Sequence, residues 1–484
     1  MNQPIRRLSI GIFAAFFALL MTVTWIQVIH ADALKADPRN PRPALSERGK
    51  ERGLIVSADG TTLAESIEDP DDPRSFIRVY PQGDAFAHAV GYSSFLVGSS
   101  GLEAVYNTEL RSRRDLTISD LIAVILGRDL RPLSLNTTLD AELQQAAFDA
   151  LDGQTGAIVA IDPMTGAILA LVSSPSFDPE SLNRDDAAEV WDQLLVAPGG
   201  PLKDRATKEV QAPGSIFKTI VTATALDTGI AEPTTQFGDP VEFQLPESTA
   251  TISNFDGRVC NDGISVTLRR GFTRSCNTVF ADLSIQLGAE DIGITTDALG
   301  WNTGLDFEWT IPPAVFDTEA LADDPAALGQ SGIGERDVRA TPLHMAMVAA
   351  AVANEGFVPS PYLVSQIFDA DGAVVEATQP TSLGRAMAPA SASVLAQMME
   401  WVVTEGTGRA AAVPNVRVAG KTGTAEGAGD GPHAWFIGFA PIENPTIAIA
   451  VLIEGGGNTG ESATGGTIAA PIASELITLW LLGS

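Results

Sequence analysis

The chain has few of the side chains that build metal sites. It contains four histidines and two cysteines in 484 residues, and these never fall at the spacings that zinc or iron–sulfur ligation requires. Basic residues are also scarce, because 30 Lys and Arg stand against 60 Asp and Glu and give a formal net charge of −30. Such a chain repels polyanions, which excludes a general nucleic-acid binder. We therefore expect no metal and no cofactor, and any chemistry must come from other side chains.

Lysine is the rarer of the two basic residues. Six of the 30 basic residues are lysines, which leaves 24 arginines. A lysine retained in such a sequence is a candidate functional residue, although codon bias toward arginine explains the scarcity equally well. The six are Lys35, Lys50, Lys203, Lys208, Lys218 and Lys421.

An uncharged apolar run begins close to the N-terminus. Residues 8–29 carry no charge over 22 positions, and a helix of that length reaches about 33 Å, enough to span a bilayer core. A cleaved signal peptide is the alternative, because Arg6 and Arg7 form a basic start and residues 31–33 offer a small-x-small cleavage site. The run exceeds the usual signal-peptide core of about 7 to 15 residues, which favours a retained anchor.

The anchor predicts where the rest of the chain lies. A short tail at residues 1–7 that carries two arginines fits a cytoplasmic start, and long domains translocate largely regardless of charge. We therefore predict a single-pass protein with a transmembrane anchor at 8–29 and residues 30–484 outside the cytoplasm. In that oxidising space Cys260 and Cys276, which lie 16 positions apart, form either a disulfide or two buried thiols.

Two modules are expected after the anchor. Residues 30–131 predict a mainly non-helical module, because 54–66 alternate around an Asp59-Gly60 turn like a hairpin. Strands at both ends of residues 132–484 predict one sheet with helices packed against it, an α/β (α+β) fold. The predicted elements of this second module are a hairpin at 155–174, helices at 215–229, 343–356 and 467–482, and strands at 417–426, 433–441 and 445–456.

The segment P-G-S-I-F-K places a hydroxyl and an amine three positions apart. Residues i and i+3 share one face of a helix, so Ser215 is a candidate nucleophile and Lys218 its base. Of the six lysines, only Lys218 has a serine three positions before it. Isolated S-x-x-K patterns usually mark a solvated helix surface. Here Pro213-Gly214 puts Ser215 at a helix start, where free N–H groups bind developing negative charge.

A second lysine, Lys421, begins the sequence K-T-G-T in a β-prone stretch. S-x-x-K and K-T-G are paired signatures of serine acyl-transfer enzymes. A charge on Lys421 and burial both disfavour protonation of Lys218, so Lys218 can act as a neutral base at pH 7. Gly423 allows close approach of a substrate backbone, while Thr422, Thr424 and Lys421 can hold a substrate carboxylate.

A Ser-x-Asn triplet is the third element of such sites, and the chain has three, which begin at Ser134, Ser181 and Ser275. Only the triplet from Ser275 to Asn277 falls between the other two motifs. Ser275 is then a candidate proton relay between Lys218 and a leaving amine, and Asn277 a candidate partner of a substrate amide. The alternative is an S-x-N sequence at an ordinary helix end.

Together these segments give the chain a resemblance to class B penicillin-binding proteins, the membrane-anchored D,D-transpeptidases of peptidoglycan synthesis. The likeness runs nearly end to end and is strongest to the actinobacterial type. No region resembles the glycosyltransferase domain of the bifunctional class A proteins. Beyond the anchor and the short tail, the resemblance rests on Arg52-Gly53-Leu54-Ile55, Asp59-Gly60, Leu63-Ala64, Gly101-Leu102-Glu103, Asp162-Pro163-Met164-Thr165-Gly166, Pro213-Gly214-Ser215-Ile216-Phe217-Lys218, Ser275-Cys276-Asn277, Ala340-Thr341-Pro342-Leu343 and Lys421-Thr422-Gly423-Thr424-Ala425.

The resemblance implies a fold and a reaction. Residues 132–484 would form a penicillin-binding, serine β-lactamase-like transpeptidase domain, and 30–131 a smaller β-rich pedestal or dimerisation-like domain. Ser215 would attack the penultimate D-Ala carbonyl of a stem peptide, release terminal D-Ala and pass the acyl group to an amine of a neighbouring stem. β-Lactams would acylate the same serine. The implied catalytic residues are Ser215, Lys218, Ser275, Asn277 and Lys421, with Thr422, Gly423 and Thr424 binding substrate and the N–H groups of Ser215 and Thr424 forming an oxyanion hole.

Two segments depart from the family pattern. Cys276 stands inside the Ser-x-Asn triplet, and residues 210–212 precede the nucleophile as V-Q-A in place of an aromatic–proline run. Neither departure touches a catalytic group. A bridge between Cys260 and Cys276 would tether the loop that carries Ser275.

Two other functions stay open. A D,D-carboxypeptidase or β-lactamase of the same fold would pass the acyl group to water, although a β-lactamase needs neither a retained anchor nor the module at 30–131. A penicillin-binding sensor or scaffold would bind without turnover. The family also implies a SEDS-type glycan polymerase as a partner in the membrane. The processes that the resemblance implies are cell division and cell shape.

Overall fold

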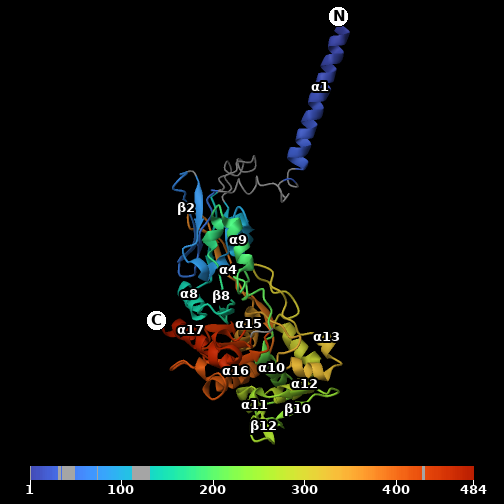
Figure 1. Cartoon of the computed structure of the whole chain (residues 1–484), viewed down its shortest axis with the longest axis vertical. Helices are drawn as coiled ribbons and strands as arrows, with labels where there is room; N and C mark the ends of the chain where they lie inside the picture. Colours follow the sequence, from blue (N-terminus) through green and yellow to red (C-terminus); the bar gives the residue numbers. More distant parts are fainter. Residues whose placement is uncertain are drawn as a thin grey trace. The chain divides into compact units, whose positions relative to one another are not determined.

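The computed structural model of the chain describes residues 2–30, 34, 49–73, 75–111, 131–427 and 431–483 (Figure 1). The chain forms two compact units. One comprises Met1–Glu51 and Ile67–Ile77, and the other comprises Arg52–Ser66 and Arg78–Ser484. The module predicted at 30–131 lies partly outside the described residues, and its boundaries stay a prediction.

The first unit contains the predicted anchor. Helix α1 (Asn2–Thr24) continues as a π-helical turn at Trp25–Ile29, and its side chains are exposed. The apolar helix Gln3–Ile29 has 27 residues and is long enough to cross a membrane. Among the described residues, Gly465–Leu482 is the other apolar helix of sufficient length, but 39% of it is buried within the fold, as in a core helix.

A five-stranded antiparallel sheet forms the core of the second unit, in the order β17-β18-β19-β7-β8. A hairpin from the start of the predicted module pairs with three strands from its end, which confirms a sheet built from both ends. Strand β17 lies at the edge. The strands are β7 (Gly156–Ile161), β8 (Ile168–Ser174), β17 (Ala419–Ala425), β18 (His433–Ala440) and β19 (Ile447–Ile453).

The turn between β7 and β8 follows from its sequence. Asp162 Oδ1 accepts hydrogen bonds from the backbone N–H of Met164 at 2.8 Å and of Thr165 at 3.4 Å, as an Asx turn does. Gly166 has a φ of +85°, and a Cβ there would lie 2.0 Å from the carbonyl oxygen of Ser360. Both the backbone conformation and the packing therefore require glycine at this position.

Helices cover both faces of this sheet. Alternate residues of a strand point to opposite faces, and in β7 Ile158 belongs to one buried cluster while Val159 belongs to the other. Helices α8 (Ala141–Ala150) and α17 (Ala470–Leu482) cover the Ile158 face. Helix α15 packs on the Val159 face, with α10 and α16 beside it. Their bounds are Lys218–Thr228 for α10, Pro342–Ala353 for α15 and Pro389–Thr404 for α16.

The remaining elements surround these layers. The helices are α4 (Ala87–Val90), α5 (Gly101–Val105), α6 (Asn107–Leu110), α9 (Ala187–Val196), α11 (Leu268–Arg274), α12 (Asn277–Ala298), α13 (Thr318–Leu321) and α14 (Pro325–Ser331). Short antiparallel pairs join β4 (Ser93–Ser94) with β5 (Gly98–Ser99), β9 (Gln236–Gly238) with β12 (Ser265–Thr267), β10 (Glu242–Gln244) with β11 (Thr251–Ser253), and β13 (Phe357–Pro359) with β16 (Ser382–Arg385).

A second sheet contains strands from both sides of residue 132. Strands β1 and β2 pair antiparallel around Asp59-Gly60, which confirms the predicted hairpin. Strand β6 pairs parallel with β1 and antiparallel with β14, so this part of the chain is not a separate sheet. The order is β15-β14-β6-β1-β2-β3, with bounds β1 (Ile55–Val56), β2 (Thr62–Glu68), β3 (Phe76–Val79), β6 (Ser134–Thr137), β14 (Val364–Phe368) and β15 (Val374–Ala377).

Glu103 on α5 is the centre of a buried ion network. Its side chain is 0% exposed, with Oε1 2.6 Å from Arg78 Nε and Oε2 2.7 Å from Arg52 Nη2. Tyr80 donates its hydroxyl to Oε1 at 3.3 Å, and Arg78 donates to the carbonyl of Gly53 at 2.7 Å. Burial by itself raises the pKa of the Glu103 carboxyl, but Arg78 and Arg52 together hold that pKa below its usual value.

Replacing Glu103 by Ala leaves Arg78 buried without its partner. Breaking a buried ion pair in this way costs about 3–5 kcal/mol. We expect Glu103→Ala to lower the free energy of unfolding by that amount in urea denaturation at pH 7, while the control Glu290→Ala, at an exposed position of α12, changes it by less than about 0.5 kcal/mol.

The sign of the pH dependence follows from the lowered pKa of Glu103. Its stabilising contribution is complete above the unfolded value of 4.5 and is lost as the pH falls through the lower folded-state pKa. The difference between wild type and Glu103→Ala should therefore shrink in strongly acidic buffer. A difference that stays constant there would contradict the assignment of the network.

Candidate active site

Ser215 lies in a 3-10 turn at the head of α10. The turn Gly214–Phe217 leads directly into the α-helix at Lys218, so Ser215 lies at a helix start as predicted, in a first turn of 3-10 form. A 3-10 turn has three residues per turn, so the side chains at i and i+3 eclipse. Lys218 Nζ consequently lies 3.0 Å from Ser215 Oγ.

The nucleophile turn is wedged against the edge strand β17. A Cβ on Gly214 would lie 2.7 Å from the carbonyl oxygen of Thr424, and Gly214 has a φ of +54°. A Cβ on Gly423 would lie 3.0 Å from both the carbonyl oxygen of Pro213 and the side chain of Ile216. The sequence interpretation assigned Gly423 to the approach of a substrate backbone. That assignment stays a prediction, and the structure adds a second reason for glycine, because a side chain there would crowd the turn.

Lys218 Nζ is surrounded by oxygen atoms and is 0% exposed. It lies 2.8 Å from the carbonyl oxygen of Ser275 and 2.7 Å from Asn277 Oδ1, and both atoms can only accept hydrogen bonds. Burial, and then the nearby charge of Lys421, lower the pKa of Lys218 well below its usual value. In the neutral amine the two N–H groups serve these acceptors, and the lone pair is left for the Ser215 hydroxyl.

Ser275 lies between the two buried lysines. Its left-handed backbone (φ 62°, ψ 43°) ends α11. Its hydroxyl accepts a hydrogen bond from Lys421 Nζ at 2.8 Å and lies 3.4 Å from Lys218 Nζ. Lys421 is 0% exposed, and burial lowers its pKa to about 7. A hydroxyl held in this way can exchange protons with either amine.

Asn277 is the first residue of α12, and both polar atoms of its side chain are used within the protein. Its Nδ2 donates to the carbonyl of Ser253 at 2.9 Å, which turns Oδ1 toward Lys218. In the structure Asn277 positions the Lys218 amine. Its predicted contact with a substrate amide stays a prediction, since Asn277 lines the cavity and its Nδ2 has a second N–H. The other two triplets do not reach the site, because Ser134 lies in β6 and Ser181 in the 3-10 turn Pro179–Asn183.

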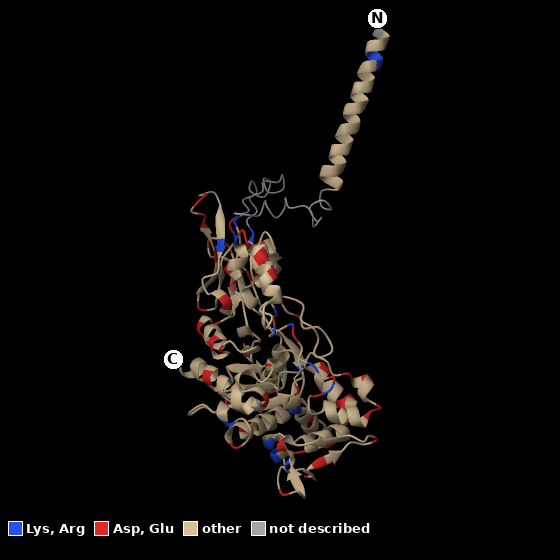
Figure 2. Cartoon of the chain, in the orientation of Figure 1, with Lys and Arg blue, Asp and Glu red and all other residues tan. Residues whose placement is uncertain are grey.

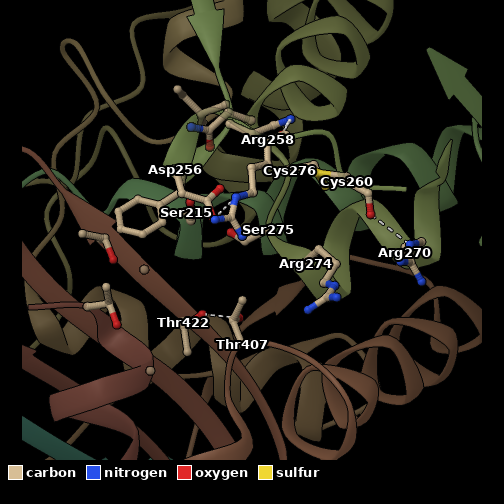
Figure 3. Close-up of a pocket in the computed structure, with 18 of the residues that line it drawn as sticks. Ser215, Asp256, Arg258, Cys260, Arg270, Arg274, Ser275, Cys276, Thr407 and Thr422 are labelled. Carbon is tan, nitrogen blue, oxygen red and sulfur yellow. Dashed lines mark hydrogen bonds and ion pairs between the residues drawn. A yellow bond between two sulfur atoms is a disulfide. The ribbon is translucent and has the colours of Figure 1, made fainter. Parts of the chain in front are cut away.

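A cavity of about 600 Å³ brings the motif residues together (Figure 3). Lys218 and Lys421 are fully buried beneath the cavity lining, where Lys218 contacts Ser215 and Lys421 contacts Ser275. A volume of this size suits a small organic or peptide group. All eight predicted site residues therefore meet at one place, with Ser215, Ser275, Asn277, Thr422, Gly423 and Thr424 in the lining.

Two lining residues had no signal in the sequence. Thr407, which follows α16, shares a 2.6 Å hydrogen bond between its hydroxyl and that of Thr422. Glu335 follows Gly334, whose carbonyl accepts from the N–H of Gly214 beside the nucleophile. Burial raises the pKa of Glu335 to about 7. Neither residue belongs to a spaced motif, so only the tertiary structure could place them here.

Cys260 and Cys276 form a disulfide, which decides between the two alternatives left by the sequence. Cys276 directly follows Ser275, and its N–H donates to the carbonyl of Gly271 at 2.8 Å. Cys260 is fixed in turn by Asp239, which accepts from its N–H at 2.7 Å. The disulfide therefore ties the loop that carries Ser275 to a second anchored segment.

We expect loss of the disulfide to weaken both the fold and the site. A bridge that closes a loop of this length stabilises by about 3 kcal/mol on the chain-entropy model. The double replacement Cys260→Ser and Cys276→Ser should lower the free energy of unfolding by that amount and should slow covalent labelling by a fluorescent penicillin, because Ser275 is less firmly held.

The double variant also supplies the control for chemical reduction. A strong reductant should slow labelling of the wild-type protein and leave the double variant unchanged. An unaltered labelling rate in the reduced wild type would contradict a role of the bridge in holding Ser275.

Known protein families and relatives match almost the whole chain. A family model described as the penicillin binding protein transpeptidase domain matches residues 156–478, and one described as the penicillin binding protein A dimerisation domain matches 52–132. The peptidoglycan D,D-transpeptidase PbpA of Mycolicibacterium smegmatis is 40% identical over 99% of this chain and 98% of its own. PbpA of Mycobacterium tuberculosis is also 40% identical, over 100% of both chains.

Solved structures agree with this match. Penicillin-binding protein A from M. tuberculosis, as its ceftriaxone acyl-enzyme complex, has a TM-score of 0.83 and 38% identity and covers 90% of this chain and 100% of that one. Its imipenem acyl-enzyme complex has a TM-score of 0.81 at 38% identity and covers 89% of this chain and 99% of that one. The resemblance seen in the sequence is thus confirmed, and the chain belongs to the penicillin-binding protein transpeptidase family.

Proposed function

We propose that this protein is a peptidoglycan D,D-transpeptidase that crosslinks stem peptides through an acyl-enzyme on Ser215. The observation that carries the proposal is the 3.0 Å contact between Ser215 Oγ and Lys218 Nζ, together with the lowered pKa of the buried Lys218. The named activity of the mycobacterial relatives and the β-lactam acyl-enzyme structures of one of them support it. The same serine is the proposed site of acylation by β-lactams.

The first half-reaction forms an ester on Ser215. Ser215 Oγ attacks the carbonyl carbon of the penultimate D-Ala residue, and its proton passes to the neutral amine of Lys218. The electron pair of the C=O bond moves to oxygen, where the N–H groups of Ser215 and Thr424 are the proposed donors. When the tetrahedral intermediate collapses, the peptide bond to terminal D-Ala breaks and its nitrogen takes up a proton.

Ser275 is the proposed carrier of that proton. Its hydroxyl lies 3.4 Å from Lys218 Nζ and 2.8 Å from Lys421 Nζ, and it lines the cavity. The hydroxyl can give its proton to the leaving nitrogen while it receives the proton held by Lys218. In this proposal Lys421 keeps the Ser275 hydroxyl in place and disfavours a lasting charge on Lys218.

Strand β17 is the proposed binding surface for the peptide. An edge strand presents backbone N–H and C=O groups that can pair with an extended chain. Thr422 and Thr424 lie on this strand and line the cavity, and Thr407 fixes the hydroxyl of Thr422. These hydroxyls and the Lys421 charge behind them are suited to hold the terminal carboxylate of the donor.

The second half-reaction transfers the acyl group. An amine of a neighbouring stem peptide attacks the ester, its proton passes to the neutral Lys218, and Ser215 recovers a proton as it leaves. A D,D-carboxypeptidase would use water in place of the amine with the same residues. The relatives named as transpeptidases favour transfer over hydrolysis and over a non-catalytic scaffold.

We further propose that a retained anchor holds the catalytic unit outside the cytoplasm. The apolar helix Gln3–Ile29 with its exposed side chains supports the anchor, and the disulfide between Cys260 and Cys276 supports an oxidising compartment. A SEDS-type glycan polymerase is the proposed partner in the membrane, on the grounds of the family resemblance.

Replacing the nucleophile tests the acyl-enzyme directly. We expect Ser215→Ala to abolish covalent labelling by a fluorescent penicillin, because no ester can form. The control Ser181→Ala, in the unrelated triplet on the 3-10 turn Pro179–Asn183, should label at the wild-type rate. Labelling that survives in Ser215→Ala, or a wild-type protein that never labels, would contradict the proposal.

The same preparation separates transfer from hydrolysis. A donor peptide ending in D-Ala-D-Ala, supplied with an acceptor amine, should yield the crosslinked product together with released D-Ala. Release of D-Ala with only the shortened peptide as product would support the carboxypeptidase alternative.

Removing the base should slow acylation without unfolding the protein. General base catalysis contributes about 10² to 10⁴ in rate, so Lys218→Met should lower the second-order rate constant of penicillin labelling by that factor. Lys203→Met is the matched control, because Lys203 is 56% exposed and pairs with Glu209 at 3.6 Å. Thermal unfolding of both variants checks the fold, and a well-folded Lys218→Met that labels normally would exclude Lys218 as the base.

A further inference from the structure

The cavity reverses the charge balance of the chain. Acidic residues outnumber basic ones by 60 to 30 in the whole sequence. The lining instead contains three arginines, Arg258, Arg270 and Arg274, against two carboxylic side chains, Asp256 and Glu335. Figure 2 shows basic residues gathered around α11, while acidic residues are spread over the second unit. Since the pKa of Glu335 is raised to about 7, the lining is more positive than this count suggests.

The three arginines differ in how far they are already paired. Arg258 is 3.7 Å from Asp256, which offsets its charge. Arg270 donates its Nε to the carbonyl of Cys260 at 2.9 Å, which leaves its terminal nitrogens for another acceptor. Arg274 has no hydrogen bond, ion pair or ring contact within the part of the chain that the structure describes, although carboxylates are abundant in this protein. Arg274 is exposed and lines the cavity, so its guanidinium is available to an acceptor from outside the chain.

The geometry of α11 directs these two arginines to the same side. Arg270 and Arg274 are separated by four residues, so they lie on one face of the helix, and Figure 3 shows both beside the disulfide and Ser275. Arg269, the neighbour on a different face, lies 3.7 Å above the ring of Trp401 and 2.5 Å from Glu405. Arg269, which is not part of the cavity lining, thus has an ion pair and a ring contact, whereas Arg274 has neither among the described residues.

We propose that Arg274, assisted by Arg270, forms a carboxylate-binding subsite beside Ser275 that selects anionic peptide substrates. Guanidinium groups bind carboxylates through two parallel N–H···O bonds, which makes arginine suited to this ligand. Arg274, Ser215 and Ser275 line the same cavity, so a carboxylate held by Arg274 belongs to a ligand that also reaches the serines. The subsite rests on the proposed function for its substrate, and its role is in specificity, separate from proton transfer.

Two carboxylates of a peptide substrate fit this chemistry. One is the terminal carboxylate of the donor, which Arg274 would then share with the hydroxyls of Thr422 and Thr424, and the other is a carboxylate on a side chain or branch of the stem. Three peptides distinguish them: one with both carboxylates free, one with the side-chain carboxylate amidated, and one with the terminal carboxylate amidated. If amidation of one carboxylate abolishes the difference in affinity between Arg274→Gln and its parent, the subsite holds that carboxylate.

Binding is measured first, on a background that cannot react. Full-length Ser215→Ala in neutral detergent is titrated with each peptide, with and without Arg274→Gln, Arg270→Gln or the control Arg269→Gln. Loss of a charge-assisted hydrogen bond is expected to weaken binding of the fully anionic peptide about 10-fold to 100-fold in Arg274→Gln, and less in Arg270→Gln. The Arg269→Gln control should bind like its parent. Equal affinity of Arg274→Gln and its parent for all three peptides would overturn the subsite.

Turnover of the same peptides by the enzyme with Ser215 intact supplies the second readout. Arg274→Gln should raise KM for the anionic peptide by the same factor and leave kcat close to wild type, because the interaction exists before the chemical step. A fall in kcat alone would overturn the assignment to substrate binding. Because the titration needs no turnover, a peptide that binds through Arg274 but is never cleaved would count against the proposed function and still support the subsite.

Discussion

Burial of the Lys218 amine is the constraint on which the whole site depends. Removing an ammonium group from water is costly, so burial lowers the pKa of a lysine and favours its neutral amine. Here two oxygens, from Ser275 and Asn277, accept its N–H groups, and the Ser215 hydroxyl takes the third direction. Lys421 is buried equally completely, and two charges this close disfavour one another. The two amines can therefore exchange a proton through the Ser275 hydroxyl that lies between them.

The scaffold brings these groups together from distant parts of the sequence. Lys218 meets Ser275 across 57 positions, and Ser275 meets Lys421 across 146. Each group is positioned by a different local feature. A 3-10 turn eclipses Ser215 and Lys218, and a left-handed residue ends α11 at Ser275. The edge position of β17 leaves Lys421 beside the cavity. The five-stranded sheet, which contains strands from both ends of residues 132–484, holds these three features in place relative to one another.

The sequence predicted the parts that depend on short spacing. A separation of three residues sufficed to pair Ser215 with Lys218, and strand periodicity placed Lys421 in β17. Other features depend on contacts between distant segments, which spacing does not encode. Thr407 and Glu335 carry no motif, the parallel pairing of β1 with β6 joins segments about eighty residues apart, and the disulfide depends on the distance between two loops. The second reason for Gly423 also required the structure, because its neighbour is the nucleophile turn.

The wedge between the nucleophile turn and β17 has a mechanical consequence. Glycine at 214 and at 423 lets the two backbones interlock without a side chain between them, and Gly465 seats a third segment against the carbonyl of Trp435. The nucleophile turn and β17 therefore form one rigid unit, since neither backbone can move without displacing the other. Bulky groups on a ligand must therefore be accommodated by the opposite wall of the cavity, which residues 254–277 form. The disulfide between Cys260 and Cys276 limits the movement of that wall. Ligand shape is thus selected on the side of the cavity that carries the arginines.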